Sequence, residues 1–286
     1  MRKFILGTDW WTDCDDAVAI RLISRAHQLG EIELLGVAIN ACMEYSAASL
    51  KAFLSSEGVD VPLGIDLAAT DFGGCPPYQK RLAEKCRLMP ENSQLENAVD
   101  LYIRLLSEIS EKAELIEIGY PQVLAELAER EPELFKDKVA RVWMMAGKWD
   151  SPTGKENNFA RNDRSRKAAR RFCNTCPVPI VFLGWEIGAG VLTGANLSKN
   201  DPLYWVLDDF GAKQGRDSWD PMLAELAIIG DFEKAGYTPI YGTAFVDETT
   251  GENTFVKQKN GLHCYVKKTL PDIEYQNRIN RKIASR

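Results

Sequence analysis

The segment that decides the fold is GTDWWTDCDDA, residues 7–17, which lies between a strand-like run and a helix-like run. Before it, residues 2–6 end in apolar side chains, as expected of a short strand. After it, residues 17–29 carry apolar side chains at helical spacing, and Asp15 and Asp16 would complement the helix dipole at the first turn. The segment therefore predicts a strand, an acidic loop and a helix in succession.

Strands and helices alternate along the rest of the chain. Strands are predicted at residues 32–39, 61–64, 115–118, 139–145, 180–183, 255–256 and 262–266, and helices at residues 47–56, 96–111, 123–129, 164–172 and 219–230. Strands separated by helices predict an α/β fold with a mostly parallel central sheet, helices on both faces and a Rossmann-like core. Residues 1–286 are expected to form a single domain, because no repeat or low-complexity linker divides them.

Ligands of such sheets bind at the carboxyl ends of the strands. Residues 7–17 follow the first strand, so the sequence places their carboxylates at that edge. Residues 68–95 and 148–162 are longer than ordinary connections and are candidates for loops around a site.

Composition excludes several classes of function. Hydrophobic residues make up 45% and charged residues 27% of the chain, which is ordinary for globular proteins, and no apolar run is long enough to predict a membrane span or a signal peptide. The net charge of −6 argues against a nucleic-acid partner, since such binding depends on Lys and Arg displacing counterions from phosphates. We therefore expect a cytoplasmic protein that binds a small molecule, with no nucleic acid and no membrane as partner.

The seven cysteines are expected to be reduced, because their number is odd and a chain of this size needs no disulfides. Cys173 and Cys176 form a C-x-x-C pair, but no second pair follows and the chain has only two histidines, so a zinc site lacks ligands. Pro177 follows directly, which also disfavours a redox motif. The remaining cysteines are scattered singly: Cys14, Cys42, Cys75, Cys86 and Cys264.

The acidic loop carries four carboxylates within eight residues, those of Asp9, Asp13, Asp15 and Asp16. Carboxylates so close together repel one another, and a hard divalent cation with oxygen ligands offsets that repulsion. The alternative is a solvated acidic turn that only complements the helix dipole. The loop by itself leaves both interpretations open.

Residues 8–17 resemble the N-terminal signature of the nucleoside hydrolase family, in a longer variant with two extra residues before the final Asp-Asp-Ala. In that family the second aspartate of the opening Asp-x-Asp binds calcium and acts as general base, which corresponds to Asp9. Gly7 stands where the first aspartate would be. The resemblance also implies that Asp16 is a calcium ligand and that Asp15 holds the ribose hydroxyls, while Asp13 belongs to the insertion and is a further candidate for substrate binding.

Two segments in the middle of the chain agree with this resemblance. Residues 115–121 look like the family's strand and turn whose backbone carbonyl completes the calcium shell, and counting places that carbonyl at Ile118. The sequence Glu-Asn-Asn-Phe at residues 156–159 is similar to the family's segment that grips the ribose 5′-hydroxyl, which makes Glu156 and Asn158 candidates for substrate binding. Taken alone, this second segment is an ordinary Asn-rich turn.

A third segment, Ser-Trp-Asp-Pro at residues 218–221, opens a predicted helix at the point where the family supplies its last calcium ligand, which corresponds to Asp220. Taken alone, Asp220 is a helix cap followed by a proline at the first helical position. Asn40 falls near the family's ribose-binding asparagine and is a weaker candidate for substrate binding.

The sequence departs from the best-known branch of the family where the base would leave. A histidine precedes the last aspartate ligand in that branch, and Trp219 stands here instead. His27 and His263 lie in no matched motif and are expected to be packing or surface residues. Candidates to stack on the base are Trp10, Trp11, Trp185 and Trp219, and candidates to protonate it are Tyr120 and Glu186.

Together these motifs imply a calcium-dependent hydrolase of ribonucleosides, purine nucleosides among them, with Ca²⁺ as cofactor and Asp9 as general base on a water that the ion orients. The resemblance further implies a homodimer or homotetramer that serves nucleoside salvage. Two alternatives stay open: a non-catalytic nucleoside- or sugar-binding protein, and a metal-dependent phosphatase of the haloacid dehalogenase type. The phosphatase requires Thr or Val two residues after the second aspartate of Asp13-Cys14-Asp15, where this chain has Ala17.

Overall fold

The computed structural model describes residues 1–11, 13–74, 76–85 and 90–284. Within these residues the main sheet has eleven strands. They are β1 (Arg2–Thr8), β2 (Ile32–Ile39), β3 (Leu63–Ile65), β4 (Glu96–Asn97), β5 (Ala113–Glu117), β6 (Val139–Met145), β7 (Gly154–Lys155), β8 (Ile180–Leu183), β11 (Tyr237–Val246), β12 (Glu252–Lys257) and β13 (His263–Lys268). A separate antiparallel pair consists of β9 (Leu192–Thr193) and β10 (Arg216–Asp217).

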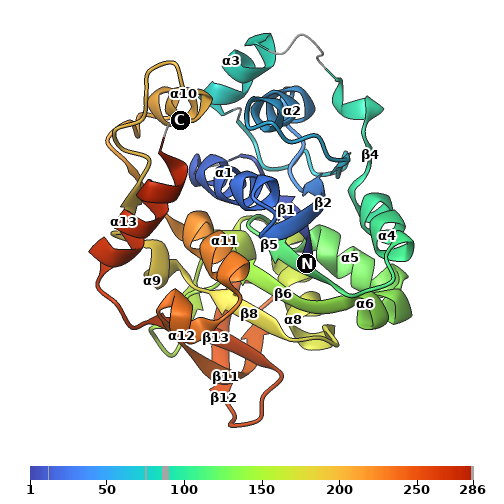
Figure 1. Ribbon diagram of the computed structural model, residues 1–286. Coiled ribbons are helices and arrows are strands. Elements are labelled where there is room, and N and C mark those ends of the chain that lie inside the picture. Colours follow the sequence, from blue (N-terminus) through green and yellow to red (C-terminus); the bar gives the residue numbers. More distant parts are fainter. Residues whose placement is uncertain (12, 75, 86–89, 285–286) are drawn as a thin grey trace.

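The strands follow the order β4-β3-β2-β1-β5-β6-β8-β13-β11-β12-β7 across the sheet (Figure 1). Every pairing from β4 to β13 is parallel, and the pairings among β13, β11, β12 and β7 are antiparallel. The prediction of a mostly parallel sheet in an α/β fold is confirmed.

Helices cover both faces of this sheet, as predicted (Figure 1). Side chains of β1 alternate between the two hydrophobic cores, because Phe4 and Leu6 belong to one and Ile5 to the other. The first core is covered by α1 (Asp15–Gln28), α2 (Ser46–Ser56), α3 (Pro77–Lys85), α10 (Pro202–Asp209), α11 (Trp219–Ile229), α12 (Phe232–Ala235) and α13 (Asp272–Ile283). The second is covered by α4 (Ala98–Glu108), α5 (Gln122–Arg130), α6 (Pro132–Lys138) and α8 (Asp163–Thr175).

The sequence did not reveal every element. The long strand β11 was missed because it contains Pro239 and Gly242, two residues that weaken a strand pattern. The two stretches predicted to be irregular contain short elements, namely α3 and η1 (Asn92–Gln94) in the first, and β7 and α7 (Asn157–Ala160) in the second.

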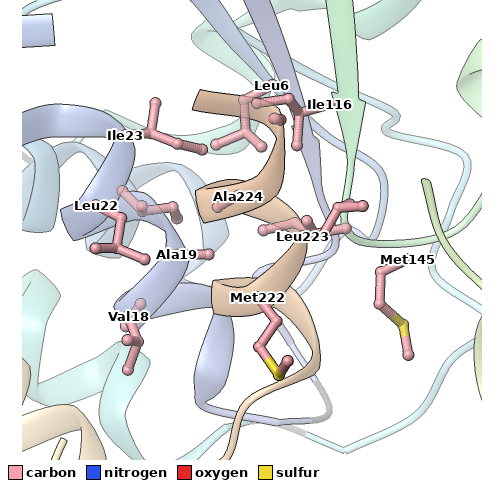
Figure 2. Close-up of a cluster of buried hydrophobic side chains, with 14 of the residues drawn as sticks. Leu6, Val18, Ala19, Leu22, Ile23, Ile116, Met145, Met222, Leu223 and Ala224 are labelled. Carbon is pink, nitrogen blue, oxygen red and sulfur yellow. The ribbon is translucent and has the colours of Figure 1, made fainter. Parts of the chain in front are cut away.

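Helices α1 and α11 pack directly against each other over the centre of the sheet (Figure 2). Ala19 and Ile23 of α1 face Leu223 and Ala224 of α11, with Leu6 of β1 beside them, and all five side chains are fully buried. The small alanine side chains allow the two helix axes to approach closely. This contact fixes where the first turns of both helices lie.

The chain reverses its direction of travel across the sheet at β1. Strands β2, β3 and β4 extend the sheet to one side of β1, whereas β5, β6 and β8 extend it to the other. At such a switch point the connections diverge and leave a crevice outside the carboxyl ends of the strands. Asp9 follows β1 and Ile118 follows β5, so both residues lie at the mouth of this crevice.

In the described part of the chain, no helix has the length and hydropathy needed to cross a membrane. The cysteines that the structure describes are free thiols, namely Cys14, Cys42, Cys173, Cys176 and Cys264. Cys75 and Cys86 lie outside the described residues.

Both histidines act within the fold as hydrogen-bond acceptors. Nδ1 of His27 accepts from the backbone N–H of Leu34 at 3.2 Å, and Nδ1 of His263 accepts from that of Ile180 at 3.1 Å. Burial lowers the pKa of His263 to about 4. His263 therefore holds β13 next to β8 in its neutral form.

We expect acid to weaken the protein through His263. Between pH 6.5 and pH 4 the unfolded chain binds a proton that the folded chain does not, so stability is lost as the pH falls through this range. His263→Asn keeps an acceptor but does not titrate. Urea unfolding at pH 7 and pH 4.5 should show a fall in the free energy of unfolding that is smaller in the variant by roughly 1–3 kcal/mol. Identical falls would contradict this role.

Candidate active site

Four buried aspartates from three segments meet at the carboxyl edge of the sheet. Asp9 follows β1, Asp15 and Asp16 begin α1, and Asp220 lies in the first turn of α11, and none is more than 5% exposed. Carboxylate oxygens of Asp15, Asp16 and Asp220 all lie within 4.8 Å of one another. The backbone N–H of Asp220 donates to Oδ2 of Asp15 at 3.1 Å, so the N-termini of the two helices meet at this point.

Local hydrogen bonds orient the carboxylates of Asp9 and Asp16. The Thr8 hydroxyl donates to Oδ1 of Asp16, and the N–H of Trp10 donates to the same oxygen at 3.3 Å. The N–H of Trp11 donates to Oδ1 of Asp9 at 3.2 Å. These donors and the positive ends of two helix dipoles partly offset the burial of negative charge.

Trp10 anchors the loop that carries these groups. Its backbone has a φ of 49°, a left-handed conformation that is unfavourable for a bulky residue. Its fully buried indole packs against Phe53 and Tyr78 and donates from Nε1 to Oγ of Ser49 at 2.7 Å. The surrounding core therefore supports the strained turn, and Trp10 faces this core rather than a ligand.

Burial raises the pKa values of the four carboxylates, and neighbouring aspartates add to the rise. Burial and then the charge of Asp16 hold the pKa of Asp9 well above its ordinary value, and burial and then Asp15 do the same for Asp220. For Asp15 the causes are burial, Asp13 and Asp16, in that order. Burial raises the pKa of Asp16 to about 7, although the Thr8 hydroxyl bond opposes the rise.

Among the described residues, no lysine or arginine pairs with these four carboxylates. The guanidinium of Arg216 pairs with Asp13, with Nε 2.8 Å from Oδ1. The charge of the cluster is therefore left to be balanced by protons or by a cation.

A pocket of about 230 Å³ opens over the cluster. Sites for drug-sized ligands have roughly 300–1,000 Å³, so this pocket suits a small molecule. The sequence-predicted site residues that line it are Asp9, Asp13, Asp15, Asp16, Ile118, Glu156, Asn158, Trp185, Trp219 and Asp220. Trp11, a sequence candidate to stack on the base, lines it too, as do Met145, Asn157 and Arg216.

Four sequence candidates do not line this pocket: Trp10, which faces the core, Asn40, Glu186 and Tyr120. The side chain of Asn40 bonds behind it, to Oε1 of Glu117 at 2.7 Å and to the N–H of Tyr120 at 3.1 Å. Glu186 turns toward Trp149, whose N–H donates to its Oε2 at 3.1 Å. The ring of Tyr120 is fully buried and stacks on Phe72.

Two tryptophans form one wall of the pocket. Trp185 and Trp219 stack with ring centroids 6.3 Å apart, and Nε1 of Trp219 donates to the carbonyl of Trp185 at 2.6 Å. The guanidinium of Arg216 lies over the ring of Trp219, with its carbon 5.2 Å from the ring centroid. No motif marked Arg216 in the sequence, because only its strand pairing and its bond to Asp13 bring it here.

Glu156 and Asn158 fix another part of the wall. Oε1 of Glu156 accepts from the N–H of Asn158 at 2.7 Å, and Oε2 accepts from the N–H of Gly147 at 2.9 Å. Nδ2 of Asn158 donates to the carbonyl of Met145 at 2.9 Å. Burial raises the pKa of Glu156 to about 7. These bonds tie the second long connection to the end of β6.

The donor set fits a hard divalent cation. Asp15, Asp16 and Asp220 form the tight group of carboxylate oxygens, and Asp9 and Ile118 line the same pocket without belonging to that group. Carboxylate and carbonyl oxygens are the ligands that Ca²⁺ prefers. The geometry thus adds Asp15 to the residues close enough to share a cation with Asp16 and Asp220.

In the presence of a chelator, the cluster should destabilise the protein as the pH rises. The raised pKa values mean that the folded protein binds more protons than the unfolded one, so stability falls between about pH 4 and pH 7. Asp16→Asn keeps the acceptor for Thr8 and removes one charge. Chemical unfolding at pH 8 should give a free energy of unfolding about 1–3 kcal/mol higher for this variant than for the wild type. A lower value would show that the repulsion is already offset.

No protein-family model and no curated protein sequence matches the chain. Solved structures match over almost its whole length. A plant nucleoside hydrolase gives a TM-score of 0.78 at 15% identity, covering 100% of this chain and 99% of that one. A purine-preferring ribonucleoside hydrolase from Gardnerella vaginalis gives 0.73 at 17% identity, covering 99% and 98%. The type III effector protein XopQ, complexed with adenosine diphosphate ribose, gives 0.70 at 14% identity, covering 99% and 93%.

At identities of 14–17% the likeness concerns the arrangement of the backbone. It extends from end to end of the chain, through the parallel sheet and the antiparallel strands at its edge. The resemblance read from the sequence is confirmed at this level. This chain has the fold of the nucleoside hydrolases.

Proposed function

We propose that this chain is a calcium-dependent ribonucleoside hydrolase that cleaves the N-glycosidic bond and releases ribose and a free base. The observation that carries the proposal is the convergence of four buried aspartates in one pocket at the switch point of the sheet. The fold shared with ribonucleoside hydrolases supports it, because the same edge of the sheet would then serve the same chemistry.

Calcium would be held by the carboxylates of Asp9, Asp16 and Asp220 and by the backbone carbonyl of Ile118, while Asp15, which also lies close enough to share the ion, would serve the ribose. Bound there, the ion would lower the pKa of water and offset the repulsion within the cluster. All four residues line the pocket, and the helix N-termini hold two of the carboxylates in place.

Asp9 would act as the general base. As the water oxygen attacks C1′ of the ribose, Asp9 accepts its proton, and the electron pair of the breaking bond goes to the base nitrogen. Asp15 would hold the 2′- and 3′-hydroxyls through its remaining acceptor sites, since Oδ2 already accepts from Asp220. The negative charges around the sugar favour an oxocarbenium-like transition state.

The rest of the pocket would position the two ends of the nucleoside. Glu156 and Asn158 would face the 5′-hydroxyl, while Trp185 and Trp219 offer flat surfaces on which a purine can stack. Asp13 would contact substrate from beside Arg216. Asn40 and Glu186 would act indirectly, because their side chains bond to Glu117 and Trp149 outside the pocket.

The resemblance also implies a homodimer or homotetramer that serves nucleoside salvage in the cytoplasm. Light scattering on the purified protein measures the oligomeric state.

Asp9→Asn should lower kcat for ribose release by roughly 100- to 10,000-fold, because the variant cannot accept a proton from water. The assay follows free ribose from a panel of purine, pyrimidine and modified ribonucleosides, with calcium and then with a chelator. Asp60→Asn, at an exposed aspartate paired with Lys51, is the matched control and should behave as wild type.

Either of two results would replace the proposal. Binding of a ribonucleoside without release of ribose would indicate a binding protein. Cleavage of a chromogenic phosphate ester, with ribonucleosides left intact, would indicate a phosphatase.

Deoxyribonucleosides should be poor substrates. Asp15 would lose a hydroxyl partner in the pocket and be left with a buried acceptor site unsatisfied. We expect kcat/KM for 2′-deoxyribonucleosides to be at least about 100-fold below that for the matching ribonucleosides. Equal values would contradict the role given to Asp15.

A further inference from the structure

The space beside Gly7 is filled by a carboxylate from the neighbouring strand. Gly7 of β1 pairs in register with Glu117 of β5. A Cβ atom added at Gly7 would lie 2.2 Å from Oε2 and 2.8 Å from Oε1 of Glu117. Glu117 is fully buried, so its carboxylate stands where a side chain at position 7 would otherwise project.

Glu117 links the ends of three strands. Its Oε1 accepts from Nδ2 of Asn40 at 2.7 Å and from the N–H of Gly119 at 3.0 Å. Asn40 follows β2, and its own N–H donates to the carbonyl of Thr8 in β1 at 2.9 Å. Its Oδ1 accepts from the N–H of Tyr120 at 3.1 Å. The amide of Asn40 is therefore held between β1, β2 and the turn that follows β5.

Asn40 and the turn after β5 pack closely against the backbone of Asp9, the proposed general base. A Cβ atom added at Gly119 would lie 2.4 Å from the backbone nitrogen of Asp9 and 2.5 Å from Oδ1 of Asn40. The turn, Asp9 and Asn40 are therefore tightly packed at this point. The N–H of Ile118 donates to the carbonyl of Gly7 at 3.0 Å. A shift of Asn40 or of the turn would therefore move both Asp9 and the Ile118 carbonyl.

We propose that Glu117 is a positioning residue: its carboxylate replaces, from β5, the side chain that β1 lacks at Gly7, and it holds Asn40 and residues 118–120 against Asp9. This inference rests on the proposed function in that Asp9 and Ile118 are the groups positioned. Burying a carboxylate is unfavourable unless its hydrogen bonds offset the loss of hydration. An apolar residue would fill the same space at lower cost, but it could not orient the amide of Asn40.

Thermal unfolding tests whether the carboxylate of Glu117 takes the place of a side chain at position 7. Gly7→Asp alone clashes with Glu117 and should lower the Tm by roughly 3–6 °C. In a Glu117→Ala background the same change returns a carboxylate to the vacated space and should raise the Tm. If Gly7→Asp lowered the Tm equally in both backgrounds, Glu117 would not be replacing a side chain at position 7.

Calcium affinity, measured by titration calorimetry, tests the positioning. Glu117→Ala should weaken it by roughly 10- to 100-fold, as expected for loss of a group that orients ligands. Glu117→Gln keeps an oxygen acceptor for Asn40 and Gly119 and should restore the affinity to within about threefold of wild type. This conservative variant also remains informative if Glu117→Ala does not fold.

Glu114→Ala is the matched control. Glu114 lies in the same strand, is also buried, and bonds to Arg2 and Trp143 instead of Asn40. The Glu114→Ala substitution should lower the Tm without changing calcium affinity. Equal losses of affinity in Glu114→Ala and Glu117→Ala would overturn the proposal.

A wild-type protein that binds no calcium would refute the proposed metal site. The comparison of Tm values would still decide whether Glu117 replaces the side chain at position 7.

Discussion

The burial of four carboxylates where the end of β1 meets the first turns of α1 and α11 is the constraint on which the structure depends. Asp15, Asp16 and Asp220 are carried to one point because α1 and α11 pack against each other in the core (Figure 2). Desolvation and mutual repulsion oppose this arrangement, and two helix N-termini with their free N–H groups only partly offset them. The apolar packing below the cluster thus supports an electrostatically unfavourable site above it.

The acidic loop is held by segments that are distant in sequence. Tyr78 of α3 donates from its hydroxyl to the carbonyl of Asp13 at 2.8 Å, and Nε2 of Gln79 donates to that of Trp10 at 2.7 Å. Arg216 ties the side chain of Asp13 to β10. Asp13, which belongs to the insertion, is therefore held at both its backbone carbonyl and its side chain, and the strained backbone of Trp10 is bonded as well.

Much of the site could be predicted because the carboxyl ends of parallel strands share one edge. The resemblance to the nucleoside hydrolases pointed to Asp9, Ile118 and Asp220, each after a strand or at the start of a helix, and all three line the pocket. Counting along the sequence fixes a position but not the direction of a side chain. Trp185 and Glu186 are neighbours in α9 (Trp185–Gly188), yet Trp185 lines the pocket while Glu186 bonds to the backbone of Trp149.

The sequence by itself determined the alternation of strands and helices, the parallel sheet, and the edge at which the acidic groups gather. The periodicity of apolar residues is a local property, and the topology of parallel strands follows general rules. A single amino-acid sequence is therefore enough to reveal both. Only the tertiary structure decided that Arg216 enters the pocket and that Glu117 fills the space beside Gly7. Both depend on strand register, such as that of Gly7 with Glu117, and register is set by the packing of the whole sheet.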